Sequence, residues 1–228
     1  MTARAVFVTG TDTEVGKTVV SCALVRGFVA QGLRTAVMKP IASGAVRTPE
    51  GLRNRDALEL LRAADVPAPY PLVNPYCFEP PISPHIAADE AKIAIDIGMI
   101  TRNLAELRER ADWAVIEGVG GWLTPLSATQ SVADLAAALD APVLLVVGLK
   151  LGCLNHAQLT RVGIRAQGAR FAGWIANHLD PQMARVEENL ASLAALLGEP
   201  PLARVPHMPA GTPAPALKDA AAALALRV

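Results

Sequence analysis

The sequence is poor in several residue classes, and each shortage argues against a class of function. Aromatic residues make up 4% of the 228 residues, which disfavours a protein that stacks nucleic-acid bases on its surface. Lysine plus arginine and aspartate plus glutamate both number 21, so no net basic charge is available for phosphate backbones or anionic membranes. We therefore expect small-molecule partners, and neither nucleic acid nor a membrane.

Cysteine is also scarce, and long apolar runs are missing. Cys22, Cys77 and Cys153 are widely spaced and form no Cys-x-x-Cys pair. This pattern favours a reducing compartment over a disulfide framework or a zinc site. The first residues lack the features of a secretory leader, and the longest apolar run, 141–149, is too short to cross a bilayer. These features predict a cytoplasmic protein.

Short apolar runs alternate with helical patterns along most of the chain, in which 52% of the residues are hydrophobic. Runs that are apolar on both faces are typical of buried parallel strands. Regular strand–helix alternation predicts a parallel sheet covered on both faces. We predict a single α/β domain, 1–228, with three layers and a mostly parallel central sheet flanked by helices. The predicted strands are 5–9, 35–39, 113–117, 143–147, 171–177 and 202–205, and the predicted helices are 17–31, 56–64, 97–110, 132–139, 155–167 and 183–197.

Proline interrupts this alternation in two places. Residues 66–85 contain seven prolines, and proline fits neither a helix interior nor a central strand. We predict an extended loop there, and a long loop inside an α/β domain is often functional. A second proline cluster follows residue 206 and precedes an alanine-rich helix.

A phosphate-binding loop follows the first predicted strand. Residues 10–18 read Gly-Thr-Asp-Thr-Glu-Val-Gly-Lys-Thr and lie between a strand and a helix, the setting that a P-loop requires. Backbone N–H groups and the helix N-terminus bind phosphate oxygens in such a loop. Lys17 would bind the β- and γ-phosphates, and the Thr18 hydroxyl would join a Mg²⁺ shell. The spacing is unusual, because five residues rather than four separate Gly10 from Gly16.

Three charged residues lie where they can complete this site. Asp56 heads a predicted helix, and Glu117 ends a predicted strand, at the sheet edge where ligands of α/β proteins bind. Carboxylates there suit Mg²⁺, although Asp56 could instead cap its helix and Glu117 could be an exposed strand end. Lys39 ends the second strand and points to the same edge, unless it faces water. A second lysine indicates a second anion, or charge that develops during transfer.

Six further motifs accompany the P-loop in order along the chain. Together with the P-loop they resemble the dethiobiotin synthetase family, from about residue 6 to about residue 180, and the similarity weakens after that point. The motifs are Lys-Pro-Ile-Ala-Ser-Gly at 39–44, Thr-Pro-Glu-Gly-Leu-Arg-Asn at 48–54, Asn-Pro-Tyr at 74–76, Ser-Pro-His-Ile at 83–86, Glu-Gly-Val-Gly-Gly-Trp at 117–122 and Lys-Leu-Gly-Cys-Leu-Asn-His at 150–156.

The resemblance implies a P-loop ligase of biotin biosynthesis. Such an enzyme carboxylates 7,8-diaminopelargonic acid with CO₂ and closes a ring, giving dethiobiotin, ADP and phosphate through a carbamate and a carbamic-phosphoric anhydride. Mg²⁺ is the implied cofactor and ATP the co-substrate. The implied catalytic residues are Lys39 and Lys17. The implied metal ligands are Thr18, Asp56 and Glu117. The residues implied to contact the diamine or the carbamate are Thr13, Glu14 and Ser43. The implied ATP-binding residues are Glu14, Val15, Gly16, Lys17, Thr18, Val19, Asp56, Glu117, Gly118, Val119, Gly120, Asn177, His178, Pro206, His207 and Met208.

The resemblance also implies a homodimer that binds the substrate carboxylate across its interface. Gly152, Cys153, Leu154 and Asn155 open a predicted helix whose N-terminus would bind the carboxylate of the neighbouring subunit. Without the resemblance the same residues would be an ordinary loop between strand and helix. Asn189 stands where related chains carry a tyrosine near the carboxylate, so the binding of that group would differ here.

Two alternatives concern the nucleotide. Residues 177–180, Asn-His-Leu-Asp, resemble an adenine-binding asparagine and also the Asn-Lys-x-Asp signature that reads guanine. The other motifs favour ATP. The main rival function is a partitioning-type P-loop ATPase switch, which carries a signature lysine five residues before the P-loop lysine. Asp12 occupies that position with the opposite charge, which argues against the rival.

Overall fold

A six-stranded sheet forms the centre of the computed structural model, which describes residues 3–209 and 211–228. The strand order is β10-β9-β8-β1-β7-β2, and every neighbouring pair runs parallel. Each strand coincides with one of the predicted apolar runs. The strands are β1 (Arg4–Gly10), β2 (Thr35–Met38), β7 (Trp113–Glu117), β8 (Val143–Leu149), β9 (Phe171–His178) and β10 (Ala203–Val205).

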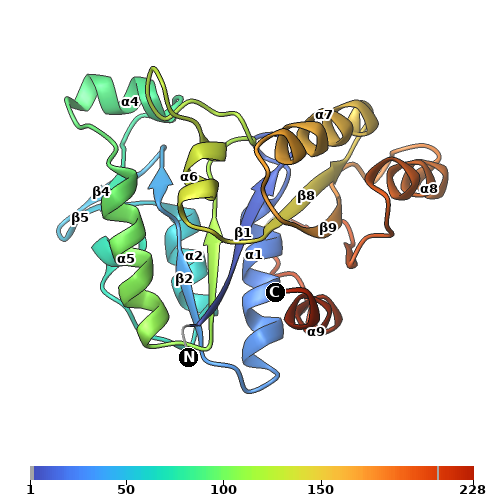
Figure 1. The fold of residues 1–228 in the computed structure, drawn as a ribbon, viewed down its shortest axis with the longest axis horizontal. Helices are drawn as coiled ribbons and strands as arrows, with labels where there is room; N and C mark the ends of the chain where they lie inside the picture. The colour runs from blue at the N-terminus through green and yellow to red at the C-terminus, as the bar shows by residue number, and fades with distance from the viewer. Residues whose placement is uncertain (1–2, 210) are drawn as a thin grey trace.

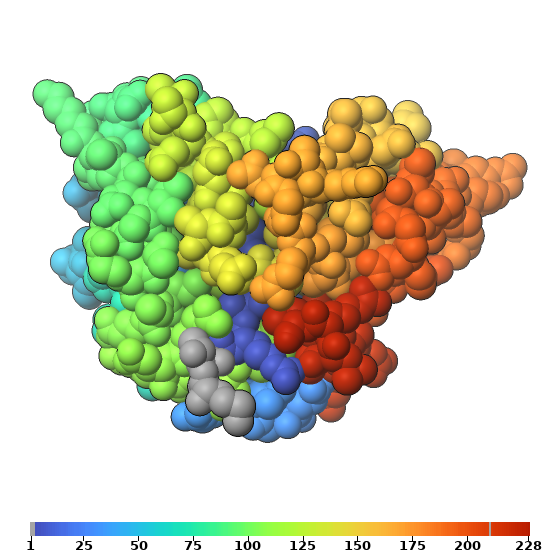
Figure 2. All heavy atoms as spheres, in the orientation of Figure 1, coloured from blue at the N-terminus to red at the C-terminus, as the bar shows by residue number. Residues whose placement is uncertain are grey.

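Helices cover both faces of the sheet, so the predicted three-layer α/β fold is confirmed (Figure 1). Successive side chains of a strand point to opposite faces: β1 directs Val6 and Val8 to one core cluster and Ala5 and Phe7 to another. One face carries α1 (Lys17–Val29), α2 (Arg55–Ala63) and α9 (Lys218–Arg227), and the other carries α5 (Ile97–Glu109), α6 (Val132–Ala138), α7 (Cys153–Ala166) and α8 (Val186–Leu197). Figure 2 shows the side formed by α5, α6 and α7, with α8 and α9 at its right-hand edge.

Helix α1 is fixed from two sides. The ring of Phe28 stacks on Trp113 of β7, with centroids 4.3 Å apart. On its outer side α1 contacts the segment that leads into α9, where the Leu217 N–H donates to the carbonyl oxygen of Ala23 at 2.9 Å. A Cβ at Gly27 would lie 2.6 Å from the carbonyl oxygen of Leu217, so only glycine permits this close approach.

The prediction of one extended loop through 66–85 is wrong. This stretch contains α3 (Tyr70–Val73), β6 (Tyr76–Cys77) and the start of α4 (Pro84–Ala91), and β6 pairs in parallel with β3 (Ile41–Ala42). Proline is tolerated in the first turn of a helix, where the N–H groups lack helical partners anyway. Pro71 and Pro84 occupy such positions in α3 and α4.

A small hairpin was not predicted either. β4 (Val46–Thr48) and β5 (Gly51–Arg53) form an antiparallel pair ahead of α2, and Gly51 has a φ of +106°. Strands of three residues carry too little alternation to be recognised in the sequence. Among the described residues, no helix has the length and apolar character needed to cross a bilayer.

Candidate functional site

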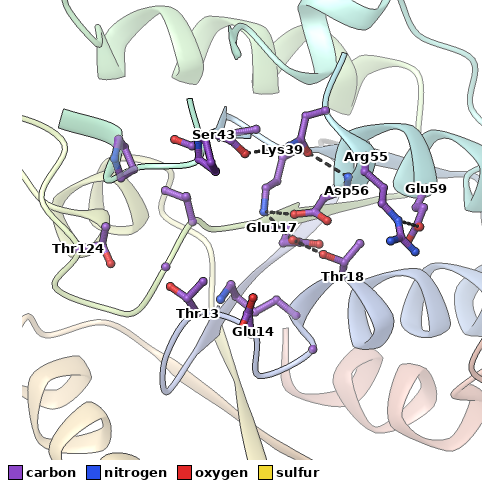
Figure 3. A pocket seen from close by; sticks show the side chains of 18 of the residues that line it. Thr13, Glu14, Thr18, Lys39, Ser43, Arg55, Asp56, Glu59, Glu117 and Thr124 are labelled. Carbon is purple, nitrogen blue, oxygen red and sulfur yellow. Dashed lines mark hydrogen bonds and ion pairs between the residues drawn. The ribbon is translucent and has the colours of Figure 1, made fainter. Parts of the chain in front are cut away.

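The carboxyl ends of β1, β2 and β7 open into a cavity of about 640 Å³ (Figure 3). These strands are neighbours in the sheet, so the loops that follow them meet at one edge. The residues that line the cavity are Thr13, Glu14, Gly16, Lys17, Thr18, Val19, Lys39, Ala42, Ser43, Asn54, Arg55, Asp56, Glu59, Pro81, Ile82, Ser83, Pro84, Glu117, Val119, Gly120 and Thr124.

The P-loop forms one wall of the cavity. It connects β1 to α1, and Gly16, with a φ of 86°, precedes the first residue of α1. No side chain caps α1, so the backbone N–H groups of its first turn remain free to bind an anion. The Lys17 ammonium donates to the carbonyl oxygen of Asp12 at 2.8 Å. The strand–loop–helix arrangement predicted from the sequence is therefore present.

Lys17 is a buried lysine in an unfavourable environment. Its pKa is lowered from 10.5 to about 8, first by burial and second by the positive charge of Lys39, against the opposing effect of nearby carboxylates. A phosphate bound in the cavity would supply the negative charge that the ammonium lacks. The P-loop is thus electrostatically prepared for an anion before one binds.

Lys39 lies deeper than Lys17 and is held by carboxylates. Its ammonium donates to Glu117 Oε1 at 2.6 Å and to the carbonyl oxygen of Gly118 at 3.1 Å, and lies 3.4 Å from Asp56 Oδ2 (Figure 3). Burial alone would lower the pKa of Lys39, but Glu117 and Asp56 outweigh that effect and raise it. Lys39 therefore carries a positive charge at the cavity, as predicted, and does not face water.

The three predicted Mg²⁺ ligands lie together. Glu117 Oε1 also accepts a hydrogen bond from the Thr18 hydroxyl at 2.8 Å, and Asp56 and Glu117 both contact the Lys39 ammonium. Glu117 Oε2 is buried and has no hydrogen-bond partner among the described residues. An unsatisfied buried carboxylate oxygen fits a ligand of a cation.

Both alternatives for these carboxylates are excluded. Glu117 is 0% exposed, so it is not a surface strand end. Asn54, rather than Asp56, caps α2, because its side-chain oxygen accepts from the N–H groups of Asp56 and Ala57. No group of three or more histidine, cysteine or acidic side chains in 3–209 and 211–228 could hold a metal alone. Mg²⁺ commonly takes one or two carboxylates together with phosphate oxygens and water, which matches this set.

Several predicted substrate and nucleotide residues face the same cavity. Thr13, Glu14 and Ser43 line it, and the Ser43 hydroxyl is buried without a hydrogen-bond partner in the described chain. Val119 and Gly120 line it as well. These groups form a polar surface next to the two lysines.

Other predicted residues lie outside this lining. Asn177, the last but one residue of β9, is buried, and its side-chain N–H donates to the carbonyl oxygen of Val15 in the P-loop at 2.9 Å. Three more groups lie outside the lining. His178 ends β9, and Pro206, His207 and Met208 follow β10. Gly152, Cys153, Leu154 and Asn155 lie at the start of α7. Their roles remain predictions.

Sequence reasoning missed part of the cavity wall. Asn54, Arg55 and Glu59 come from the start of α2, Thr124 follows β7, and 81–84 close one side. An Asn directly before a helical pattern is an N-cap signal, and it could have placed the start of α2 at the site. The prolines of 80–84 fall in the stretch 66–85, which the sequence marked only as a long loop of a kind that is often functional. Its contact with the cavity could not be predicted, because the path of this stretch depends on α3 and β6.

The geometry defines a P-loop nucleotide-binding protein. The family model described as an AAA domain matches residues 4–214. An ATP-dependent dethiobiotin synthetase of Xylella fastidiosa strain M12 is 49% identical over 211 residues, covering 92% of this chain and 93% of its own. One of Salmonella typhi is 50% identical over 202 residues, covering 89% of each. The chain belongs to the dethiobiotin synthetase family.

Solved structures with the same fold are more distant. The MinC:MinD cell division protein complex of Aquifex aeolicus gives a TM-score of 0.63 at 16% identity, covering 99% of this chain and 97% of that chain. A ParA family ATPase from Chlorobium tepidum gives 0.54 at 14% identity, covering 90% and 85%. At such low identity the likeness supports the fold alone.

Gly16→Ala should abolish nucleotide binding. Besides the strain of a positive φ, a Cβ at Gly16 would lie 2.0 Å from the side-chain nitrogen of Asn177. Either the P-loop or the Asn177 side chain, which holds the carbonyl oxygen of Val15 in that loop, must shift. Gly32→Ala is the matched control, because Gly32 has a φ of +78° and nothing within 4 Å of its Cβ. Calorimetric titration with MgATP should show a loss of at least about tenfold, or 1.4 kcal/mol, for Gly16→Ala only. Equal affinities of the two variants would contradict this role.

Lys17→Met should stabilise the nucleotide-free protein at pH 7. Because the folded pKa of about 8 lies below the ordinary 10.5, the unfolded chain binds more protons between these values. The cost of the buried ammonium is therefore fully present below pH 8 and disappears above pH 10.5. Urea unfolding should show a gain of about 1–3 kcal/mol at neutral pH that shrinks toward pH 10. The exposed Lys218→Met is the control, and a less stable Lys17→Met protein at pH 7 would refute the argument.

Proposed function

We propose that this protein catalyses the ATP-dependent carboxylation and ring closure of 7,8-diaminopelargonic acid with CO₂, yielding dethiobiotin, ADP and phosphate. The observation that carries the proposal is the pair of buried lysines, Lys17 and Lys39, on one cavity. A P-loop alone needs only the first of them. The second suits a reaction in which another anion forms beside the triphosphate.

The reaction has three steps that the cavity can accommodate. One amine of the substrate attacks CO₂ and loses a proton, forming a carbamate. A carbamate oxygen then attacks the γ-phosphorus, the bond to the β–γ bridging oxygen breaks, and ADP leaves. The second amine attacks the carbonyl carbon of this mixed anhydride, phosphate leaves, an amine proton is lost and the urea ring closes. Positioning and charge stabilisation dominate such phosphoryl transfer.

The two lysines have different roles in this proposal. Lys17 binds the β- and γ-phosphates from the P-loop, and its pKa rises again as the anion binds. Lys39 contacts the carbamate and the transferring phosphoryl group from the opposite side, with Glu117 and Asp56 keeping it charged. The hydroxyls of Thr13 and Ser43 and the Glu14 carboxylate, which line the cavity, would bind the diamine and the carbamate. Lys39 is therefore the residue on which the rate depends most.

The unpaired Glu117 oxygen supports a place for Mg²⁺. Thr18, Asp56 and Glu117 would hold the ion, which supplies neutralisation of phosphate charge when bound. The Thr18 hydroxyl already touches Glu117, so these two residues are pre-arranged. Asp56, which is partly exposed, would complete the set from the start of α2.

The proposed base site and dimer rest on residues outside the cavity. Asn177 and His178 of β9, with Pro206, His207 and Met208 after β10, would flank the adenine. For the dimer, the start of α7 would bind the substrate carboxylate of a second subunit through the segment 152–155. Leu151, Leu159 and Val162 are exposed apolar side chains on or beside α7, as an interface between copies requires.

A partitioning-type ATPase switch is not favoured, although MinD and ParA share the fold. Such a switch carries a lysine where this chain has Asp12. Here the carbonyl oxygen of Asp12 accepts from the Lys17 ammonium, and its carboxylate accepts from the Thr13 N–H. Asp12 thus shapes the loop from within and supplies no positive charge.

Mass spectrometry tests the proposed activity directly. Purified protein is incubated with 7,8-diaminopelargonic acid, ¹³C-labelled bicarbonate and MgATP. We expect dethiobiotin that carries the label, together with one ADP per ring closed. ATP hydrolysis that is independent of the diamine, without labelled product, would refute the proposal and favour the switch.

Lys39→Met should slow ring closure strongly while nucleotide binding persists. Loss of one charge-stabilising donor costs about 2.7–4 kcal/mol in the transition state, or a factor of about 10²–10³ in kcat. Because Lys17 and the N-terminus of α1 still bind the phosphates, the Kd for MgATP should change by less than about tenfold, or 1.4 kcal/mol. Turnover and calorimetry on Lys39→Met and the control Lys218→Met separate the two effects. Turnover like that of wild type in Lys39→Met would exclude the catalytic role.

A further inference from the structure

A partly buried polar network beside the cavity connects two of its charged residues. Its centre is the hydroxyl of Tyr70 in α3, which accepts a hydrogen bond from the Asn54 N–H at 2.7 Å and donates to Asn74 Oδ1 at 2.8 Å. Arg53 covers the Tyr70 ring, with its guanidinium carbon 4.3 Å from the ring centroid. Tyr70 is not among the residues that line the cavity.

One arm of the network fixes the backbone of Lys39. The Asn74 amide donates to the carbonyl oxygen of Lys39 at 2.6 Å and to that of Tyr76 at 3.2 Å. The Lys39 N–H in turn donates to the carbonyl oxygen of Val73 at 2.9 Å. The peptide groups on both sides of the Lys39 Cα are therefore held by the α3–β6 segment.

The other arm fixes the start of α2. The side-chain oxygen of Asn54 accepts from the Asp56 N–H at 2.9 Å, and its amide donates to the carbonyl oxygen of Ser43 at 3.2 Å. Asp56 is thereby held in the first turn of α2, facing Lys39. The two arms end on the two members of the 3.4 Å ion pair between Lys39 and Asp56.

Burial makes this network sensitive to the loss of one group. Asn74 is 2% exposed and Asn54 is 5% exposed. Without the Tyr70 hydroxyl, the Asn54 N–H would lose its acceptor and Asn74 Oδ1 its donor, and an unmade bond of a buried group is costly. The backbone at Asn54 and the side chain of Asn74 would then move to find other partners, and the two arms would shift independently.

We propose that Tyr70 is a positioning residue, which sets the distance between Lys39 and Asp56 through Asn74 and Asn54. The inference rests on the proposed function, because Lys39 and Asp56 are the groups whose spacing matters there. A small misplacement of groups at a reacting centre can cost about 10²-fold in rate. Tyr70 thus controls both the rate and the ability of Asp56 to hold Mg²⁺, without touching substrate.

Tyr70→Phe tests this role, with Tyr76→Phe as the matched control. The Tyr76 hydroxyl also accepts a backbone N–H, that of Asp96 at 2.8 Å, but this bond leads to the start of α5 instead of the cavity. We expect Tyr70→Phe to lower kcat about tenfold, equivalent to about 1.36 kcal/mol, with little change in KM for the diamine. The Mg²⁺ concentration that half-saturates ADP binding in calorimetric titrations should rise. Tyr76→Phe should lower the melting temperature similarly and leave both quantities unchanged.

Two results would overturn the inference. One is a Mg²⁺ dependence and kcat for Tyr70→Phe that match those of Tyr76→Phe. The other concerns the double variant Tyr70→Phe/Asn54→Ser. If its loss of activation free energy, taken from kcat, equals the sum of the losses in the two single variants, the two residues do not interact as members of one network should. Asn54→Ser keeps a cap for α2 and removes the amide group that donates to the carbonyl oxygen of Ser43. It therefore also serves if Tyr70→Phe fails to fold, and a normal Mg²⁺ dependence of Asn54→Ser would again count against the network.

The Mg²⁺ titration separates this inference from the proposed function. It needs no turnover, so a raised half-saturating concentration in Tyr70→Phe would support the positioning role even if wild type formed no dethiobiotin. Conversely, wild-type ring closure combined with an unaffected Tyr70→Phe protein would refute the positioning role alone.

Discussion

The ion pair between Lys39 and Glu117 is the interaction on which the site depends. Lys39 is 3% exposed and Glu117 is 0% exposed, and removing two such charges from water costs several kcal/mol for each ion. Each charge therefore depends on partners of opposite charge or on hydrogen bonds beside it. Their neighbours, Asp56, Thr18 and the carbonyl oxygen of Gly118, bring the P-loop helix, α2 and the end of β7 to one point.

A buried pair of this kind contributes little to stability compared with apolar side chains of similar size. Its presence in a core otherwise rich in valine, leucine and alanine is therefore explained by what it presents to the cavity. The same reasoning applies to Lys17, whose burial lowers its pKa to about 8. The protein holds two positive charges close together in a poorly solvated place, and a polyanion is the partner that relieves this arrangement.

The sheet and the P-loop could be predicted from the sequence because their signals are local. The run Trp113–Glu117 is apolar until its last residue, and the structure shows a buried strand with those bounds. The network around Tyr70 could not be predicted. Its bonds join Asn54 to Tyr70 across 16 positions and Asn74 to Lys39 across 35, and bonds from side chain to distant backbone leave no periodic pattern. The prolines of 66–85 concealed α3 and α4 for a different reason. Proline is tolerated in the first turn of a helix but not in its interior, and the sequence alone did not show that Pro71 and Pro84 lie in first turns.

The contact between α1 and the segment leading into α9 has a consequence for how the protein is made. Arg26 of α1 donates to the carbonyl oxygen of Ala214, which lies 188 positions later in the chain. During synthesis the outer face of the P-loop helix therefore stays uncovered until the ribosome has released nearly all of the residues described. Domains that depend on such distant contacts fold late and expose apolar surface in the meantime. Chains interrupted before residue 214 should leave this helix face bare, which makes them targets for chaperones and proteases rather than partly active enzymes.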